Sequence, residues 1–222
     1  MDFLNSIILL TNFIIVPGIT YGSQLALGAI GVTLIYGVLR FANFAYGDLM
    51  AFGTMVVILM TWYLQSKGIS FGLLPTALLA LPIGILLTIA VSLFFDKTVF
   101  EYYRNKKSNP VTFIVVSLGI MFVLNAVVRI IIGPNDINFM DGHKFIMKAR
   151  EFKQLTGLNE GLAIKSTQVI TLVTTIITCS ILFYFLNKTK TGKSMRAYSN
   201  NEDLALLSGI DPKKIVLITW VI

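Results

Sequence analysis

Charged residues are scarce in this sequence. Only 13% of its 222 residues are Asp, Glu, Lys or Arg, whereas about 25% of the residues in an ordinary soluble domain are charged. Hydrophobic residues make up 55% of the chain and include 16 Phe and 8 Met. A soluble fold with this composition would lack the polar side chains that its surface requires. The composition therefore excludes an ordinary soluble domain and indicates a membrane protein.

Cysteine and histidine are almost absent. The single cysteine, Cys179, excludes a disulfide within the chain and any metal site built from several cysteines. The single histidine, His143, has no Cys or second His nearby, so we expect no metal site. Polar residues inside the apolar runs are mostly Ser and Thr, which commonly serve helix packing in membranes. The sequence thus predicts neither an enzyme nor a cofactor bound by this chain.

The net charge of +7 does not indicate nucleic-acid binding. The basic residues lie between apolar runs and form no single patch with interleaved aromatic residues. No basic side chain precedes the first apolar run, in MDFLNSIILLTNF, and no clear cleavage site of small residues follows it. We therefore expect the N-terminus to be retained and not removed as a signal peptide.

Long uncharged runs define the expected architecture, because a helix needs about 20 mainly apolar residues to cross a bilayer. The run from Phe3 to Leu39 is too long for one ordinary span. Pro17 and Gly18 are expected to divide it into a short or tilted initial segment and a span from roughly Ile19. The other complete candidate spans are Leu49 to Ser66, Gly68 to Phe95, Ser108 to Val128 and Ser166 to Asn187.

The positions of Lys and Arg predict how the bundle is oriented. Because successive spans alternate sides, Arg40 and the segments 96–107 and 188–214 share one face with eleven basic residues, against seven on the other face. Basic residues favour the cytoplasmic side. We expect a single all-α domain over residues 1–222, a polytopic transmembrane helix bundle of about five complete spans plus an incomplete one at 215–222. Its outer loop is expected at about 133–165 and its main cytoplasmic loop at about 188–214.

The cytoplasmic loop contains a predicted short helix. Ser199 followed by Glu202 fits a capping box, and Gly209 supplies a stop. Leu204 and Leu207 fall on one face of this helix. An apolar face at the membrane surface, surrounded by Lys and Arg, requires a docking surface. The alternative is a connector that lies on lipid headgroups.

The same loop contains a partial nucleotide-binding pattern. The tripeptide GKS at 192–194 resembles the end of a P-loop, but Asn187 stands where the pattern requires glycine. The stretch also follows a predicted membrane span, whereas a P-loop follows a β-strand. The phosphate cradle needs the missing glycine amides. If ATP is used, we therefore expect another chain to bind it.

The stretch VLRFANFAYGDLMAFG, residues 38–53, places polar side chains between two apolar runs. One interpretation is a tight cytoplasmic turn, with Arg40 at the headgroups and Asp48 near the start of the next helix. The other is a broken helix that lines a translocation path. Arg129, near the end of a span, either reaches the headgroups or lines the outer part of that path. The residues predicted to line the path are Gly37, Asn43, Gly47 and Asp48.

With these residues in view, the sequence resembles the membrane-embedded permease subunits of bacterial ABC importers, in the branched-chain amino-acid permease family. GVTLIYGVLRFANFAYGDLMAFG, residues 31–53, resembles the family's N-terminal signature. GKSMRAYSNNEDLALLSGID, residues 192–211, is similar to its cytoplasmic coupling segment. The resemblance covers essentially the whole chain. Because family members continue through further spans after this segment, the sequence is expected to be truncated at its C-terminus.

The resemblance implies a function and a set of partners. The chain would be the translocation subunit of an ATP-driven importer for branched-chain amino acids in the bacterial cytoplasmic (inner) membrane. ABC ATPase subunits would bind the ATP and receive the short helix. A second permease subunit, identical or paralogous, and a periplasmic or extracellular solute-binding protein would complete the importer. The residues assigned to ATPase coupling are Arg196, Asn201, Leu204, Ala205, Leu207 and Gly209.

Other functions fit parts of the same pattern. Urea or short-amide permeases of this family look alike at this level of detail. A self-sufficient secondary transporter would often carry ionisable residues deep within its spans, and here the span interiors show none apart from Arg129 near an end. A membrane scaffold would need no capped cytoplasmic helix. The dependence of uptake on ATP distinguishes the importer from the secondary transporter and the scaffold.

Overall fold

The computed structural model describes residues 2–70, 74–135, 139, 141 and 145–222. The lone histidine, His143, lies outside the described residues. Two short strands, β1 (Phe145–Met147) and β2 (Ile164–Lys165), form an antiparallel pair. The helical elements are α1 (Asp2–Leu10), η1 (Thr11–Ile15), α2 (Val16–Leu39), α3 (Tyr46–Ser66), α4 (Ala77–Phe95), η2 (Asp96–Phe100), α5 (Glu101–Asn105), α6 (Pro110–Ile132), α7 (Ala149–Thr156), α8 (Ser166–Lys188), α9 (Lys190–Asn200), α10 (Glu202–Leu207) and α11 (Pro212–Val221), with η1 and η2 as π-helical turns.

Long apolar helices make up the membrane part of the chain. Within the described residues, five helical runs have the length and composition to cross a bilayer. These runs are Phe3–Leu39, Tyr46–Ser66, Ala77–Asn105, Pro110–Ile132 and Ser166–Lys188. The prediction of an all-α polytopic bundle with about five spans is therefore confirmed. The third run begins at Ala77, whereas the sequence predicted that this span begins nine residues earlier, at Gly68.

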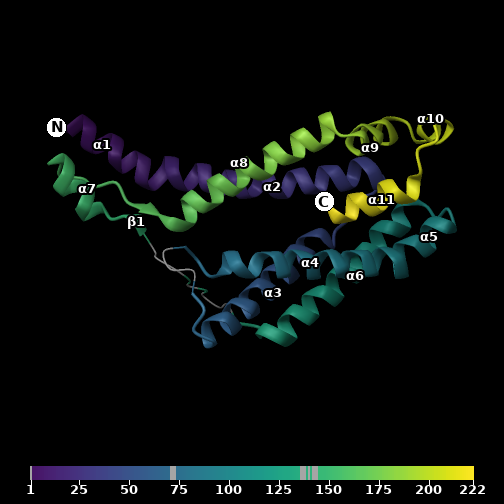
Figure 1. Cartoon of the computed structure of the whole chain (residues 1–222), viewed down its shortest axis with the longest axis horizontal. Coiled ribbons are helices and arrows are strands. Elements are labelled where there is room, and N and C mark those ends of the chain that lie inside the picture. Colours follow the sequence, from purple (N-terminus) through teal and green to yellow (C-terminus); the bar gives the residue numbers. More distant parts are fainter. Residues whose placement is uncertain (1, 71–73, 136–138, 140, 142–144) are drawn as a thin grey trace.

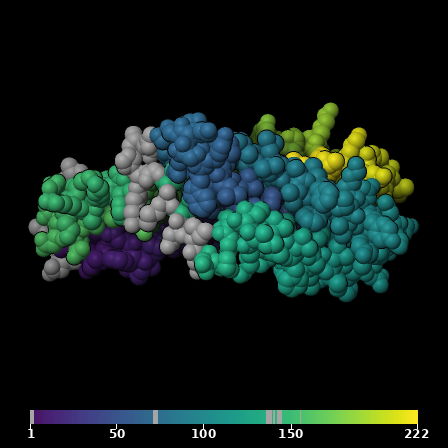
Figure 2. Space-filling model, turned by 90° about the horizontal axis from the view of Figure 1, so that it is seen from below, coloured from purple at the N-terminus to yellow at the C-terminus, as the bar shows by residue number. Residues whose placement is uncertain are grey.

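The spans form two groups. α3 packs against both α4 and α6, whereas α2 packs against α8, and α11 contacts α2, α4 and α9 (Figure 1). α5, α9 and α10 lie at one end of the bundle, called here the α9 end (Figure 1). α1, α7 and β1 lie at the opposite end, called here the α7 end. Figure 2 shows the face on which α6 lies beside α3.

The first helical run is continuous, so the expected break at Pro17 and Gly18 is wrong. Helix α1 passes through the π turn η1 directly into α2, and the N–H of Val16 donates to the carbonyl of Thr11. Pro17 follows at once, in the first turn of α2. A proline is tolerated there because the wider π turn has already altered the hydrogen-bond ladder that its missing N–H would interrupt.

Asparagines on this helix hold the loop that precedes α8. The side chain of Asn12 donates to the carbonyl of Gly161 (2.7 Å) and accepts from the N–H of Ala163 (3.0 Å). Asn5 accepts from the N–H of Glu160 (3.3 Å). These bonds satisfy polar groups that would otherwise be costly beside apolar side chains. They join the first helix to the α7 end of the bundle.

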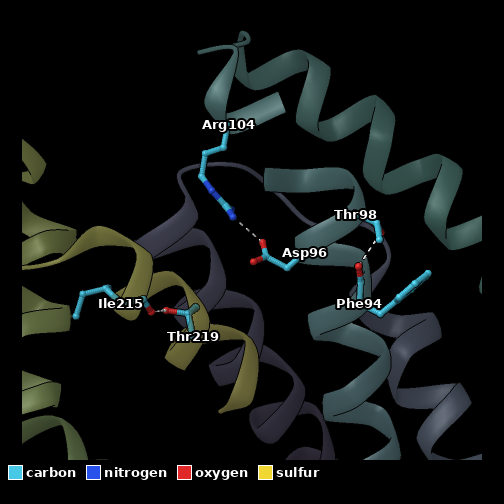
Figure 3. Close-up of polar contacts among 6 residues, drawn as sticks. All are labelled: Phe94, Asp96, Thr98, Arg104, Ile215 and Thr219. Carbon is cyan, nitrogen blue, oxygen red and sulfur yellow. Dashed lines mark hydrogen bonds and ion pairs between the residues drawn. The ribbon is translucent and has the colours of Figure 1, made fainter. Parts of the chain in front are cut away.

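Aromatic stacking forms the core near the α9 end. The ring of Phe41 stacks on Phe113 and Phe100 at centroid distances of 5.0 and 5.4 Å, and Phe100 lies 5.2 Å from Trp220. Close beside this core, Asp96 in η2 accepts from Arg104 of α5 (2.9 Å; Figure 3). The cluster joins the segment after α2, η2, the start of α6 and α11.

Candidate coupling helix and polar row

Helix α10 is capped at its start by Asn201. Its side-chain oxygen accepts from the N–H of Leu204 (3.0 Å), and its backbone is extended. The prediction that Ser199 caps this helix is wrong, because α9 continues to Asn200 and Ser199 has helical backbone. Glu202 bonds instead to the hydroxyl of Tyr198, which donates at 2.7 Å. The predicted short helix is present, and its cap, Asn201, lies two residues after the predicted cap.

Gly209 ends α10 as predicted. Its φ is 78°, a left-handed value that favours glycine. Its N–H donates to the carbonyl of Leu206 (3.0 Å), and the N–H of Ile210 donates to that of Ala205 (3.1 Å). This pair of bonds is a Schellman motif. With caps at both ends, α10 holds a fixed shape despite its short length.

The two faces of α10 differ sharply. Leu204 is 61% exposed and Leu207 is 85% exposed. Ala205, on the inner face, is 3% exposed and packs in a cluster with Val38 and Met195. Ala205 therefore seats α10 on the rest of the chain, and Leu204, Leu206 and Leu207 are exposed on its outer side.

Helix α9 is attached to the end of α2. The hydroxyl of Ser199 donates to the carbonyl of Gly37 (2.8 Å), and the guanidinium of Arg40 donates to the carbonyl of Ser199. A Cβ on Gly37 would lie 3.1 Å from that hydroxyl oxygen, so glycine permits the close approach. Burial and the hydrogen bond to Glu202 raise the pKa of Tyr198, which keeps this phenol protonated. Gly37, predicted in the path, lies at the contact between α2 and α9.

Arg196, the remaining residue that was predicted to take part in coupling, contacts α8. Its Nη1 donates to the side-chain oxygen of Asn187 (3.0 Å) at the end of that helix. The GKS tripeptide at 192–194 is helical within α9, and the N–H of Gly192 donates to the hydroxyl of Thr189, which caps the helix (3.0 Å). The tripeptide therefore lies in the first turns of a helix that directly follows the long apolar helix α8; that another chain binds any ATP stays a prediction.

The contact between α9 and α2 gives a first testable prediction. Replacing Ser199 with alanine removes its bond to Gly37 and is expected to lower the stability of the protein by about 1 kcal/mol. The measurement is thermal unfolding in detergent. Ser194→Ala is the matched control, because that hydroxyl donates only to Lys190 in its own helix (3.0 Å). Equal melting temperatures for the two variants would contradict the contact.

The chain enters the bundle after α2. Arg40 lies at α9, whereas the N–H of Phe44 donates to the hydroxyl of Ser117 (3.1 Å) and Asp48 accepts from the side-chain amide of Asn125 (3.0 Å). At 1.5 Å per residue, Ser117 and Asn125 lie about 10 and 22 Å along α6 from Pro110. Residues 40–45 therefore interrupt the helix and lead back from the α9 end into the bundle.

The predicted path residues have different surroundings. Asn43 is 8% exposed, and its Oδ1 accepts from the N–H of Ala45 (3.1 Å). Its buried Nδ2 has no hydrogen-bond partner among the described residues. Gly47 is exposed, and Asp48 is partly exposed. The structure thus uses Asn43 to shape the turn before α3 and leaves Asp48 accessible; that these residues line a path stays a prediction.

Three side chains form a hydrogen-bonded row between α3 and α6, called here the polar row: Asp48, Asn125 and Arg129. Asn125 donates to Asp48 and accepts from Nε of Arg129 (2.9 Å). Both α6 residues are exposed. The role of Asn125 was missed from sequence, although its position four residues before Arg129 places both on one face of α6. In the described part of the chain, no group of three or more His, Cys, Asp or Glu could hold a metal ion.

Known proteins resemble this chain over most of its length. Residues 14–222 match the family described as "Branched-chain amino acid transport system / permease component". The chain is 25% identical over 209 residues to the high-affinity branched-chain amino acid transport system permease protein LivH of Escherichia coli K12, covering 92% of this chain and 64% of LivH.

Two further relatives come from other organisms. Identity is 25% over 217 residues with the permease protein BraD of Pseudomonas aeruginosa, covering 94% of this chain and 65% of BraD. Identity is 27% over 217 residues with a probable branched-chain amino acid transport permease protein LivH of Methanocaldococcus jannaschii, covering 95% of this chain and 62% of that protein. The chain therefore spans less than two thirds of the length of these relatives. No solved structure matches it significantly.

Proposed function

The chain belongs to the family of branched-chain amino acid transport system permease components, and from this membership we propose that it is the translocation subunit of an ATP-driven importer for branched-chain amino acids. It is a multi-pass membrane protein with a permease role. In the proposal it lies in the bacterial cytoplasmic membrane, with the α9 end in the cytoplasm. A second permease subunit and an extracytoplasmic solute-binding protein complete the importer.

The exposed face of α10 is the structural observation that supports the coupling to an ATPase. Leu207 is 85% exposed on a helix that is capped at both ends and seated by the buried Ala205. An apolar side chain held out from a fixed helix is typical of a helix that binds in a groove of a partner protein. The partner in the proposal is an ABC ATPase, which binds the ATP itself.

The contacts described above provide a route from this helix to the spans. α10 adjoins α9, Ser199 of α9 bonds to the carbonyl of Gly37, and Arg40 bonds back to Ser199. The segment 40–45 then leads directly into α3 and Asp48. In the proposal, ATP-driven movement of the ATPases is passed along this route and changes which side of the membrane the permease pair opens to.

The energy source gives a second testable prediction. Proteoliposomes that contain the chain with its ATPase, second permease and binding protein are expected to take up leucine only with ATP. Vanadate should stop this uptake, and removal of ion gradients should not. Uptake that survives ATP depletion but is lost with the ion gradient would identify a secondary transporter. Uptake of urea in place of leucine would identify an amide permease.

A further inference from the structure

We propose that the polar row is a binding station for the zwitterionic end of the transported amino acid. In this station Asp48 binds the α-ammonium group and Arg129 binds the α-carboxylate. The inference rests on the proposed function and adds to it a site and the chemistry of that site. It places the site between α3 and α6, where the described polar side chains Asp48, Asn125 and Arg129 form one continuous hydrogen-bonded row.

The spacing of the two charges suits an amino acid. Asp48 and Arg129 do not form a direct ion pair; the carboxamide of Asn125 stands between them, with hydrogen bonds of 3.0 and 2.9 Å. An α-amino acid has its ammonium and carboxylate on the same carbon. With one hydrogen bond at each end it spans a similar gap, so it can lie alongside Asn125 and bind both charges.

Toward the described residues, the row's strongest binding groups make only the bonds that join the row. Asp48 uses Oδ1 for Asn125, and Oδ2 has no hydrogen bond to any described residue. Arg129 uses Nε, so both Nη groups are likewise free of bonds to the described part of the chain. A guanidinium fork binds a carboxylate with two parallel hydrogen bonds. Each end of a zwitterion therefore finds a group of opposite charge that has hydrogen-bonding capacity left over among the described residues.

Asp48 carries its charge at the depth of Asn125, and this argues against a lipid-facing position for the row. Asn125 lies about 22 Å along α6 from Pro110 and about 10 Å before its end at Ile132. Charged side chains at such positions are costly against lipid and normally face a water-filled cavity or the interior of a bundle. Asn125 and Arg129 are exposed in the single chain, and in the proposal the side of α6 that carries them faces a path or a subunit boundary that contains water.

The same face offers an apolar contact for the side chain of the substrate. Phe122 is 68% exposed and lies three residues before Asn125 and seven before Arg129, on the same side of α6. A leucine bound by its charged end would direct its side chain toward this ring. An open row with one apolar neighbour gives a weak, transient station, which transport requires because the substrate must also leave.

The test removes charge but keeps the hydrogen bonds. Asp48→Asn retains an oxygen acceptor for Asn125, and Arg129→Gln retains an N–H donor. In proteoliposomes with the whole importer, each change is expected to lower ATP-driven leucine uptake by about tenfold or more, because the charge that binds one end of the substrate is lost while the bond to Asn125 remains. Stimulation of the ATPase by the loaded binding protein should stay within about twofold. Arg150→Gln, an exposed arginine on α7, is the matched control.

A double exchange makes the test sharper. Asp48→Arg with Arg129→Asp presents the same two charges in reverse, and a zwitterion can bind in the opposite direction. We expect uptake at least about threefold above that of either single reversal. Uptake within about twofold of the unmodified importer in both charge-removing variants would overturn the station.

Two other outcomes also decide the matter. Loss of ATPase stimulation together with uptake would place the two charges in assembly and overturn the station. An unmodified importer that takes up no leucine with ATP would overturn the proposed function, and this inference with it.

Discussion

Replacing Leu207 with aspartate is expected to abolish ATP-driven uptake while leaving the protein folded in the membrane. The side chain is 85% exposed, so the change costs the fold little. In the proposed complex the same position enters a groove of the ATPase, where an unpaired carboxylate would be desolvated. Loss of a central apolar anchor typically costs about 2 kcal/mol or more, and a buried unpaired charge adds to this.

The measurement is co-purification of the ATPase with the chain, together with leucine uptake. Ile146→Asp is the matched control, because this residue is 59% exposed on β1 at the α7 end, far from α10 along the molecule. It should leave co-purification unchanged. If the Leu207 variant binds the ATPase as well as the unmodified chain does, α10 is not the docking helix.

Replacing Gly192 with alanine is expected to destabilise the turn between α8 and α9 severely. A Cβ at this position would lie 2.2 Å from the carbonyl oxygen of Phe185 and 2.6 Å from Cα of Leu186. Both are backbone atoms, so no side-chain rotation relieves the overlap and the two helices must separate. Overpacking of this kind costs about 1–3 kcal/mol, and it also displaces Ser199 from α2.

Thermal unfolding in detergent and the amount of protein in membranes measure this effect. Gly119→Ala is the matched control, since a Cβ there meets nothing within 4 Å and the residue lies inside α6. Alanine favours a helix over glycine by about 1 kcal/mol, so the control should be neutral or stabilised. A Gly192 variant as stable as this control would show that α8 and α9 can move apart freely.

The spans could be predicted from the sequence because their cause is local. A run of apolar residues between charges must cross the bilayer as a helix, whatever the other helices do. The short helix α10 could also be predicted, since Gly209 and the leucines act within a few residues of one another. The predicted cap was wrong because Ser199 is drawn into α9, where its hydroxyl bonds to α2, 162 positions earlier.

The polar row could not be predicted either, because it too depends on contacts between residues that are far apart in the sequence. Asp48 and Asn125 are 77 residues apart, and nothing local indicates that the segment 40–45 leads back into the bundle. At Pro17 the sequence predicted a break that the structure does not have. A proline usually interrupts a helix, but the π turn before it keeps the first helix continuous. Sequence reasoning therefore identified the polar stretch and its glycines, and only the packing of α3 on α6 shows what Asp48 contacts.

The continuous first helix has a mechanical consequence. Its apolar run has 37 residues and is about 55 Å long, whereas the hydrocarbon layer is about 30 Å thick. Ser199 is attached near one tip, and Asn5 and Asn12 hold the loop before α8 near the other. Because the helix is continuous, a movement at one of its ends also moves the other end. A tilt of about 5° at the α9 end displaces the far tip by about 5 Å over this length.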